Sequence, residues 1–294
     1  MRDVRPPTID PRAASRWQRR SQMASAWLHE EVARRMEQRL DWIVRQPERW
    51  LHWEPVRGGL QAQRLLARRY PRAACLVQAE EPAERRLAEQ AAAIAWWQPR
   101  RWWSHRQAAA AAAPVDLLWA NMSLHMVADP QRLIRQWHDA LAVDGVLMFS
   151  CLGPDSLREL RALYAAQGWP APAHEFTDMH DWGDMLVEAG LAEPVMDMER
   201  IELTFDSPQR LLQELRELGR NLHPARFAAL RGCGWRDRLH TALQTLADPA
   251  DGRLRLTFEV IYGHAWRPQR RLAVAAETAL SLDEMRGALR RGRV

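Results

Sequence analysis

Val115-Asp-Leu-Leu-Trp-Ala120 opens the stretch of sequence that decides the fold, which continues as NMSLHMVADPQRLIRQWHDALAVDGVLMFS to Ser150. The first six residues have the length and apolar composition of a buried strand. Asp129 followed by Pro130 indicates a helix start, because aspartate caps free N–H groups and proline is favoured at the first helical position. Four apolar side chains follow at helical spacing, namely Leu133, Ile134, Trp137 and Leu141.

The same stretch ends in a second predicted strand. Asp144-Gly145 is expected to form a turn. Val146 to Ser150 is a continuous apolar run of the kind found in sheets that are covered on both faces. Strand, helix and strand in this order predict a doubly wound α/β fold.

A similar unit is predicted upstream. Met23 to Val44 carries apolar residues at three- and four-residue intervals, which indicates a helix that Pro47 ends. Short apolar runs at Trp50–Trp53 and Ala73–Val77 flank a helical stretch, Leu60–Arg69. We therefore expect a second strand–helix–strand unit in this half of the chain.

The segment from Pro82 to Ala113 predicts a helix, then a tryptophan-rich part and an alanine-rich part. Its tryptophans receive no element assignment, since such residues more often pack in cores or loops than form a ligand platform. They are Trp96, Trp97, Trp102 and Trp103.

The C-terminal part predicts helices inserted between two late strands. Met179–Ala189 reads as a helix ended by Gly190, and Pro194–Phe205 reads as a strand. Ser207-Pro208 opens a helix that continues into an arginine-rich helical stretch up to about Leu246, before a closing strand at Leu254–Tyr262. Because such an insertion lies over the sheet edge where substrates enter, we expect it to be a lid.

These assignments divide the chain into three parts. Residues 1–47 form an N-terminal helical segment, and residues 48–268 form the α/β domain, which includes the helical lid at 207–252. Residues 269–294 form a C-terminal tail, in which Ser281 and Glu284 make the capping box of a short helix.

Composition limits the class of protein. No apolar run approaches the roughly 18 to 20 residues that a membrane helix needs, and the basic N-terminus lacks the apolar core of a secretory signal. The widely spaced cysteines Cys75, Cys151 and Cys233 favour neither disulfides nor a zinc site, so we expect a reducing cytoplasm and no bound metal.

The chain has a net charge of +5, and all 42 basic residues are arginine. This charge favours acidic partners, such as a small acidic carrier protein, although scattered solvated arginines are an equally good explanation. No nucleic-acid-binding motif is present, so nucleic acid is not an expected partner.

Several segments in order resemble the malonyl-acyl-carrier-protein O-methyltransferases of biotin synthesis and their relatives among mitochondrial complex I assembly factors. The resemblance runs from about Asp10 to Pro268. It rests on Asp10–Trp17, Leu40–Ile43, Asn121–Met126, Phe149–Leu157, Leu215–Asn221 and Glu259–Trp266. It implies a Rossmann-like class I methyltransferase sheet with an N-terminal helix and a helical lid inserted before the last strand.

The resemblance further implies transfer of a methyl group from S-adenosylmethionine to the free carboxylate of malonyl-acyl carrier protein. A carboxylate is already a nucleophile and a sulfonium is already a good leaving group. Catalysis then depends mainly on alignment of the reactants and exclusion of water. We therefore expect a cofactor cradle and a substrate clamp, and no catalytic triad.

The cradle of such a fold is a glycine-rich turn after the first strand, preceded by an acidic residue. In the matching stretch His52 stands at the acidic position, and Glu54 and Val56 stand at the first two glycine positions. Only Gly58 agrees with the pattern, and Glu54 and Gly58 are the candidate cofactor-binding residues of this loop. A β-branched valine with positive φ would cost about 1–2 kcal/mol, so the loop is expected to follow a different path.

Other cofactor positions are matched in part. Ala79 stands at the end of the second strand, where a carboxylate usually accepts the ribose hydroxyls, and Glu80 or Glu81 could serve if the strand shifts. Both glutamates could equally begin a helix. The acidic residue expected near the adenine has no counterpart among residues 102–113. Asn121 matches at the end of the fourth strand of the family, where open sheets bind ligands.

Substrate-side candidates are a histidine and three lid arginines. His125 is a candidate catalytic contact near the transferred methyl group, or a packed loop histidine. Arg216, Arg220 and Arg226 could dock an acidic carrier or clamp a carboxylate, or could be solvated helix-face residues. Tyr262 and His264 are expected to be structural.

Three functions follow from the resemblance and the altered turn. The first is an active S-adenosylmethionine-dependent methyltransferase acting on a carrier-bound carboxylate. The second is a member of the fold that has lost the cofactor and serves as a partner or regulator. The third, after the assembly-factor relatives, is a protein-arginine hydroxylase.

Overall fold

The computed structural model describes residues 9–93, 113–227 and 229–269. A mixed six-stranded sheet forms the centre, in the order β2-β1-β3-β4-β6-β5. Its strands are β1 (Arg49–Trp53), β2 (Ala74–Gln78), β3 (Val115–Ala120), β4 (Leu141–Leu152), β5 (Ala192–Phe205) and β6 (Leu254–Trp266).

Strands β1 to β4 are parallel, whereas β6 runs antiparallel between β4 and β5. The chain builds outward from β1 to β2 and then returns to place β3 on the other side of β1. This reversal creates a switch point between the carboxyl ends of β1 and β3, which is where open α/β sheets bind ligands. The doubly wound α/β fold and both parallel strand–helix–strand units predicted from the sequence are confirmed.

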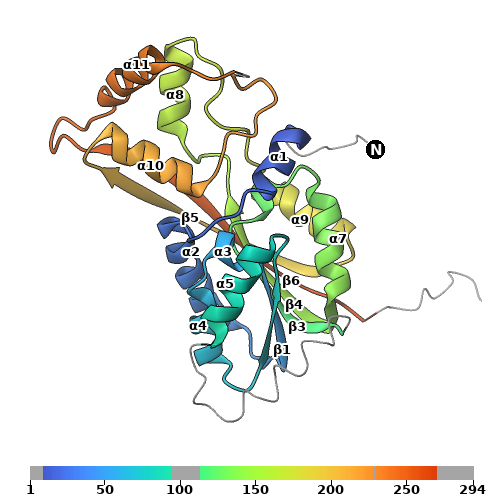
Figure 1. Ribbon diagram of the computed structural model, residues 1–294. Helices are drawn as coiled ribbons and strands as arrows, with labels where there is room; N and C mark the ends of the chain where they lie inside the picture. The colour runs from blue at the N-terminus through green and yellow to red at the C-terminus, as the bar shows by residue number, and fades with distance from the viewer. Residues whose placement is uncertain (1–8, 94–112, 228, 270–294) are drawn as a thin grey trace, which may run out of the picture.

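Helices cover both faces of the sheet (Figure 1). Apolar residues of α2 and α4 pack on one face, and those of α7 and α9 pack on the other. Shorter helices lie at the switch point, such as α3, and near the N-terminus, such as α1. The helices are α1 (Pro11–Gln18), α2 (Trp27–Gln38), η1 (Arg39–Trp42), α3 (Pro55–Gly58), α4 (Ala62–Arg69), α5 (Pro82–Ala93), η4 (Leu124–Met126), α7 (Pro130–Ala140), α8 (Arg158–Ala166), α9 (Met179–Glu188), α10 (Pro208–Leu218) and α11 (Cys233–Gln244).

Short polar side chains begin the helices as predicted. Asp129 accepts a hydrogen bond from the backbone N–H of Arg132 at 2.9 Å, and Ser207 accepts one from Arg210 at 3.3 Å. The turn predicted at Asp144-Gly145 is wrong, because β4 begins earlier, at Leu141, and runs through both residues. Asp144 adopts a positive φ of 59° there, which bends the strand without ending it.

Three helices, α8, α10 and α11, lie together beyond the carboxyl ends of β1 to β4 (Figure 1). We call α10, α11 and the segment between them the lid. The helical stretch predicted through this region is interrupted, because residues 219–227 and 229–232 are not helical. Helix α8 was not predicted, and it packs its apolar side chains into the same core as α2 and α4.

Some predictions concern residues outside the described ranges. They include the tryptophan-rich segment 94–112, the tail 270–294 and its capping box. Within the described part of the chain, no helix is both long enough and apolar enough to cross a membrane. The predicted division at residues 47 and 268 stays a prediction.

Candidate functional site

The loop after β1 takes a path unlike a glycine-rich turn. Glu54 adopts a left-handed conformation with φ 46°, and the chain then forms the single turn α3. Val56 is buried inside that turn and has no positive φ, so the strain considered for a valine does not arise. The positive φ falls instead on Glu54 and Gly59. The different path expected from the sequence is confirmed.

Gly58 and Asn121 meet at the switch point. A Cβ atom added to Gly58 would lie 2.6 Å from the backbone oxygen of Asn121, so only glycine allows this approach. The Asn121 side chain donates from Nδ2 to the backbone oxygens of Gly58 and of His29, the latter at 2.8 Å. Its Oδ1 accepts from Ser150 Oγ at 2.6 Å. The asparagine predicted to bind cofactor thus joins β3, β4, α2 and α3.

Arg57 holds the same loop from the outside. Its guanidinium donates to the carboxylate of the fully buried Glu84 at 3.1 and 3.2 Å. It also donates to the backbone oxygens of Trp17, Gln18 and Arg20, at 2.7 to 3.3 Å. One side chain therefore connects the end of α1, α5 and the switch-point loop.

Two buried histidines underlie the switch point. His29 on α2 hydrogen-bonds through Nδ1 to the backbone oxygen of Arg57 at 2.6 Å, and burial lowers its pKa to about 4. His52 on β1 is fully buried, neither ring nitrogen has a hydrogen-bond partner, and burial lowers its pKa to about 3. Both rings are therefore neutral at pH 7.

Glu54 is the buried acid of this region. Its Oε1 accepts from the backbone N–H of Glu80 at 2.9 Å, whereas its Oε2 is buried without a hydrogen-bond partner. Burial raises its pKa from 4.5 to about 7, and the nearby carboxylates of Glu84 and Glu80 add to this effect. Ala79 is buried beneath, and Glu80 is exposed at the carboxyl end of β2. Glu54 and Glu80 thus lie together, as a pair of predicted cofactor residues.

A cavity of about 230 Å³ lies under the lid, beside this switch point. Its wall is mostly apolar and comes from β4, β6, α8, α10 and the loop before α9. The apolar lining includes Leu152, Leu157, Leu160, Leu212, Leu215 and Phe258. Its polar lining includes His29, His125, His174, Arg216, Arg220 and Asn221. Because ligand pockets for drug-sized molecules hold about 300–1,000 Å³, this cavity suits a small group.

His125 lies on one wall of the cavity. The residue is buried, its Nδ1 has no hydrogen-bond partner, and burial followed by the neighbouring His174 and His29 holds its pKa well below the usual value. His174 Nε2 bonds to the backbone oxygen of His125 at 2.8 Å, and both rings contact Phe176 edge-on. His174 and Phe176 were missed from the sequence, because they lie in a loop without periodicity.

The three lid arginines occupy different places. Arg216 is exposed at the cavity, and Arg220 is half-buried in its wall, where burial lowers the pKa of its guanidinium. Arg220 is also held by the backbone oxygen of Gly219 at 2.6 Å. Arg226 does not line this cavity, because it pairs with Asp10 Oδ2 at 2.7 Å and so ties the N-terminus to the lid.

Tyr262 on the closing strand β6 is buried, and its hydroxyl has a hydrogen-bond partner. Its hydroxyl donates to the Glu199 carboxylate, and the Arg39 guanidinium lies 3.6 Å from its ring centroid. These contacts agree with the structural role expected for Tyr262.

The doubly wound sheet, its antiparallel strand β6 between β4 and β5, and the lid over the switch point define a class I methyltransferase-type α/β protein. No protein-family model matches the chain. A malonyl-[acyl-carrier protein] O-methyltransferase of Gallionella capsiferriformans is 37% identical over 256 residues, which cover 85% of this chain and 87% of that protein. The Halorhodospira halophila protein of the same name is 33% identical over 82% of this chain and 81% of that one.

The chain therefore belongs to the malonyl-[acyl-carrier protein] O-methyltransferase family, as the resemblance predicted. The match to the Laribacter hongkongensis member is 42% identical but spans only about half of that protein, 52% of its length. Among solved structures, the YcgJ protein of Bacillus subtilis aligns with a TM-score of 0.49 and 11% identity, over 82% of this chain and 100% of that one.

Proposed function

We propose that this protein is an S-adenosylmethionine-dependent methyltransferase that esterifies the free carboxylate of a malonyl group carried on acyl carrier protein. The observation that carries the proposal is the small apolar cavity beside the switch point, with the half-buried Arg220 in its wall. Such a cavity fits a short acyl group with a terminal carboxylate, which an arginine recognises well. The names of the full-length relatives support the same substrate.

The residues at the switch point fit one end of the cofactor. One buried carboxylate oxygen of Glu54 has no hydrogen-bond partner and lies 3.7 Å from Arg57 Nε, and Glu80 is exposed beside this carboxylate. The carboxylates of these two residues would accept hydrogen bonds from the ribose hydroxyls or from the ammonium group of S-adenosylmethionine. Asn121 and Gly58 are engaged with each other, so they would shape the cradle and not contact the cofactor through the asparagine side chain.

S-adenosylmethionine, when bound, supplies an electrophilic methyl carbon, which a carboxylate oxygen attacks as the carbon–sulfur bond breaks and its electrons pass to sulfur. The chain has to align the carboxylate and exclude water. Arg220 would hold the carboxylate, and the neutral His125 would orient it without adding charge. The apolar wall would cover the rest of the acyl group.

Cofactor binding is expected to strengthen as pH rises from 6 to 8. The pKa of Glu54 is raised to about 7, so the carboxylate that accepts hydrogen bonds is the major form only above that pH. For the same reason the unliganded protein loses stability as pH rises from 4.5 to 7, because the folded state holds a proton that the unfolded state releases. Titration calorimetry with S-adenosylmethionine at each pH measures the first effect.

Variants of the two glutamates test whether they cause the pH dependence and the affinity. Glu54→Gln should flatten the pH dependence, and Glu80→Ala should weaken binding far more than the neighbouring Glu81→Ala. A pH-independent affinity in the wild-type protein, or equal effects of Glu80→Ala and Glu81→Ala, would sink the proposed role of these acids.

Arg220→Met is expected to raise the KM for malonyl-acyl carrier protein about tenfold or more, because the variant keeps the apolar stem and loses the carboxylate partner. Mass spectrometry of the carrier reports the methyl ester, and its appearance with the wild-type protein is the direct test of the proposed function. Arg226→Met changes the arginine that pairs with Asp10, so it is the control for the loss of one positive charge outside the cavity. A similar KM in both variants would contradict the clamp.

A further inference from the structure

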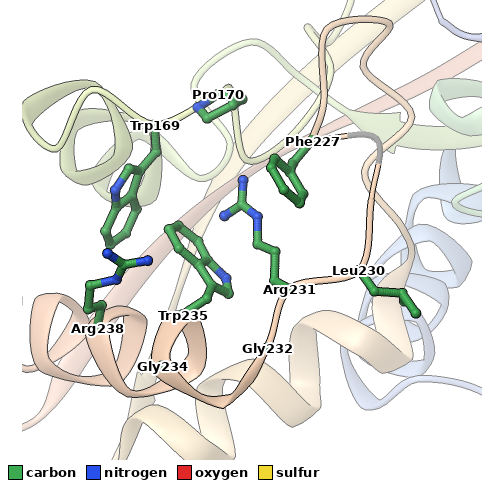
Figure 2. Close-up of a pocket in the computed structure, with 9 residues that line it drawn as sticks. All are labelled: Trp169, Pro170, Phe227, Leu230, Arg231, Gly232, Gly234, Trp235 and Arg238. Carbon is green, nitrogen blue, oxygen red and sulfur yellow. The ribbon is translucent and has the colours of Figure 1, made fainter.

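A second hollow, an open groove of about 710 Å³, lies on the outer surface near α8 and α11 (Figure 2). Trp169 and Pro170, which follow α8, form one side. Trp235 and Arg238 of α11 form the floor, with Arg231 just before the helix. None of these residues belongs to the cofactor region or to the cavity described above.

Aromatic rings in edge-to-face contact line the groove. The Trp169 and Trp235 rings meet at 4.3 Å between centroids, and Tyr164 meets Trp169 edge-on at 5.2 Å. The Arg231 guanidinium lies 3.5 Å from the Trp235 ring centroid and 4.3 Å from that of Phe227. Figure 2 shows Arg231 between these two rings. Preformed aromatic and arginine surfaces of this kind are typical of protein-binding hot spots.

The groove carries the positive charges of Arg231 and Arg238. Over the described residues, no carboxylate forms an ion pair with Arg231 or Arg238, and the nearby Asp237 lies 3.8 Å from Arg236. The rim is also apolar, since Leu230 is 100% exposed and Phe227 is 48% exposed. An apolar rim around unpaired arginines suits an acidic protein surface with exposed apolar side chains.

One loop separates the groove from the cavity under the lid. The loop from Trp169 to His174 borders the groove with its first two residues and the cavity with its last three. Asn221 fixes the middle of this loop by donating to the backbone oxygen of Ala171 at 2.7 Å. A partner seated in the groove would therefore lie one short loop away from His174 and the cavity.

We propose that this groove, formed by Trp169, Phe227, Leu230, Arg231, Trp235 and Arg238, docks the acidic face of the acyl carrier protein. This inference rests on the proposed function and adds the surface that recognises the carrier. The groove holds the protein part of the substrate, and the cavity beyond the 169–174 loop takes its acyl group.

Binding of malonyl-acyl carrier protein, measured by fluorescence anisotropy without cofactor, tests the docking surface. Arg238→Glu and Trp235→Ala are each expected to weaken binding about tenfold or more, and added salt should weaken the wild-type complex in the same way. Arg135→Glu, the same charge reversal at an exposed site on α7, is the matched control and should bind like the wild type. Equal binding by Arg238→Glu and Arg135→Glu would overturn the proposal.

Turnover separates this inference from the proposed function. With malonyl-pantetheine, which lacks the carrier protein, Arg238→Glu should match the wild type, whereas with malonyl-acyl carrier protein its KM should rise. Methylation of both substrates with no difference between the variants would overturn the docking site alone. Methylation of neither substrate by the wild-type protein would overturn the proposed function. Competition for the groove by a single-stranded oligonucleotide, with no binding of the carrier, would assign it to nucleic acid and overturn the docking site.

Discussion

Arg57→Ala is expected to lower the free energy of unfolding by about 3–5 kcal/mol, the usual result of removing one partner of a buried ion pair. The variant leaves the Glu84 carboxylate buried and without its cation. It also removes the guanidinium donor from the backbone oxygens of Gln18 and Arg20, and from that of Trp17, which keeps the backbone N–H of Arg20 as a donor. Denaturant unfolding in urea, followed by circular dichroism, measures the loss.

Two further variants identify the cause. Arg64→Ala removes an exposed arginine of α4 and should change the free energy of unfolding by about 0.5 kcal/mol or less. The double variant Arg57→Ala/Glu84→Ala should lose less than the sum of its single changes, because it removes the unpaired charge together with the arginine. A strictly additive double variant would show that Arg57 acts through its backbone contacts and not through Glu84.

Local signals in the sequence predicted most of the sheet and its helices. Asp129, Ser207 and Gly190 act at helix ends as their side-chain chemistry or backbone freedom predicts, because capping depends only on neighbouring residues. Asp144 was taken for a turn because aspartate before glycine favours one. Leu141 pairs with β3, and Val146 pairs with both β3 and β6, so the residues between them stay in the strand as a local irregularity.

The sequence predicted where the candidate site lies better than it predicted what each residue does there. Asn121 was expected at the switch point, since it follows a buried strand, and it lies there. Its bonds to His29 and Gly58 join residues distant in sequence, so no pattern along the chain reports them. The same is true of Arg57, which is one of 42 arginines and is distinguished only by its contacts.

Asn121→Asp is expected to lower the free energy of unfolding of the unliganded protein by about 3 kcal/mol or more. The reason is that a buried carboxylate oxygen, which only accepts hydrogen bonds, would then face two backbone oxygens, which also only accept. The aspartate has nearly the same shape and still accepts from Ser150 Oγ. It cannot donate to the backbone oxygens of Gly58 and His29, as the Asn121 amide does. The loss would therefore report the two lost hydrogen bonds together with the burial of a carboxylate beside two acceptors, and not a change in packing.

This substitution also decides what Asn121 does for the cofactor. If the asparagine shapes the cradle, Asn121→Asp lowers the stability of the unliganded protein, and S-adenosylmethionine binding falls with it. If the side chain instead contacts the cofactor directly, the variant keeps its stability in urea and loses only affinity in the calorimeter. Gln90→Glu, an amide-to-acid change at an exposed position of α5, should alter neither measurement. The buried network around Asn121 makes the first result the expected one.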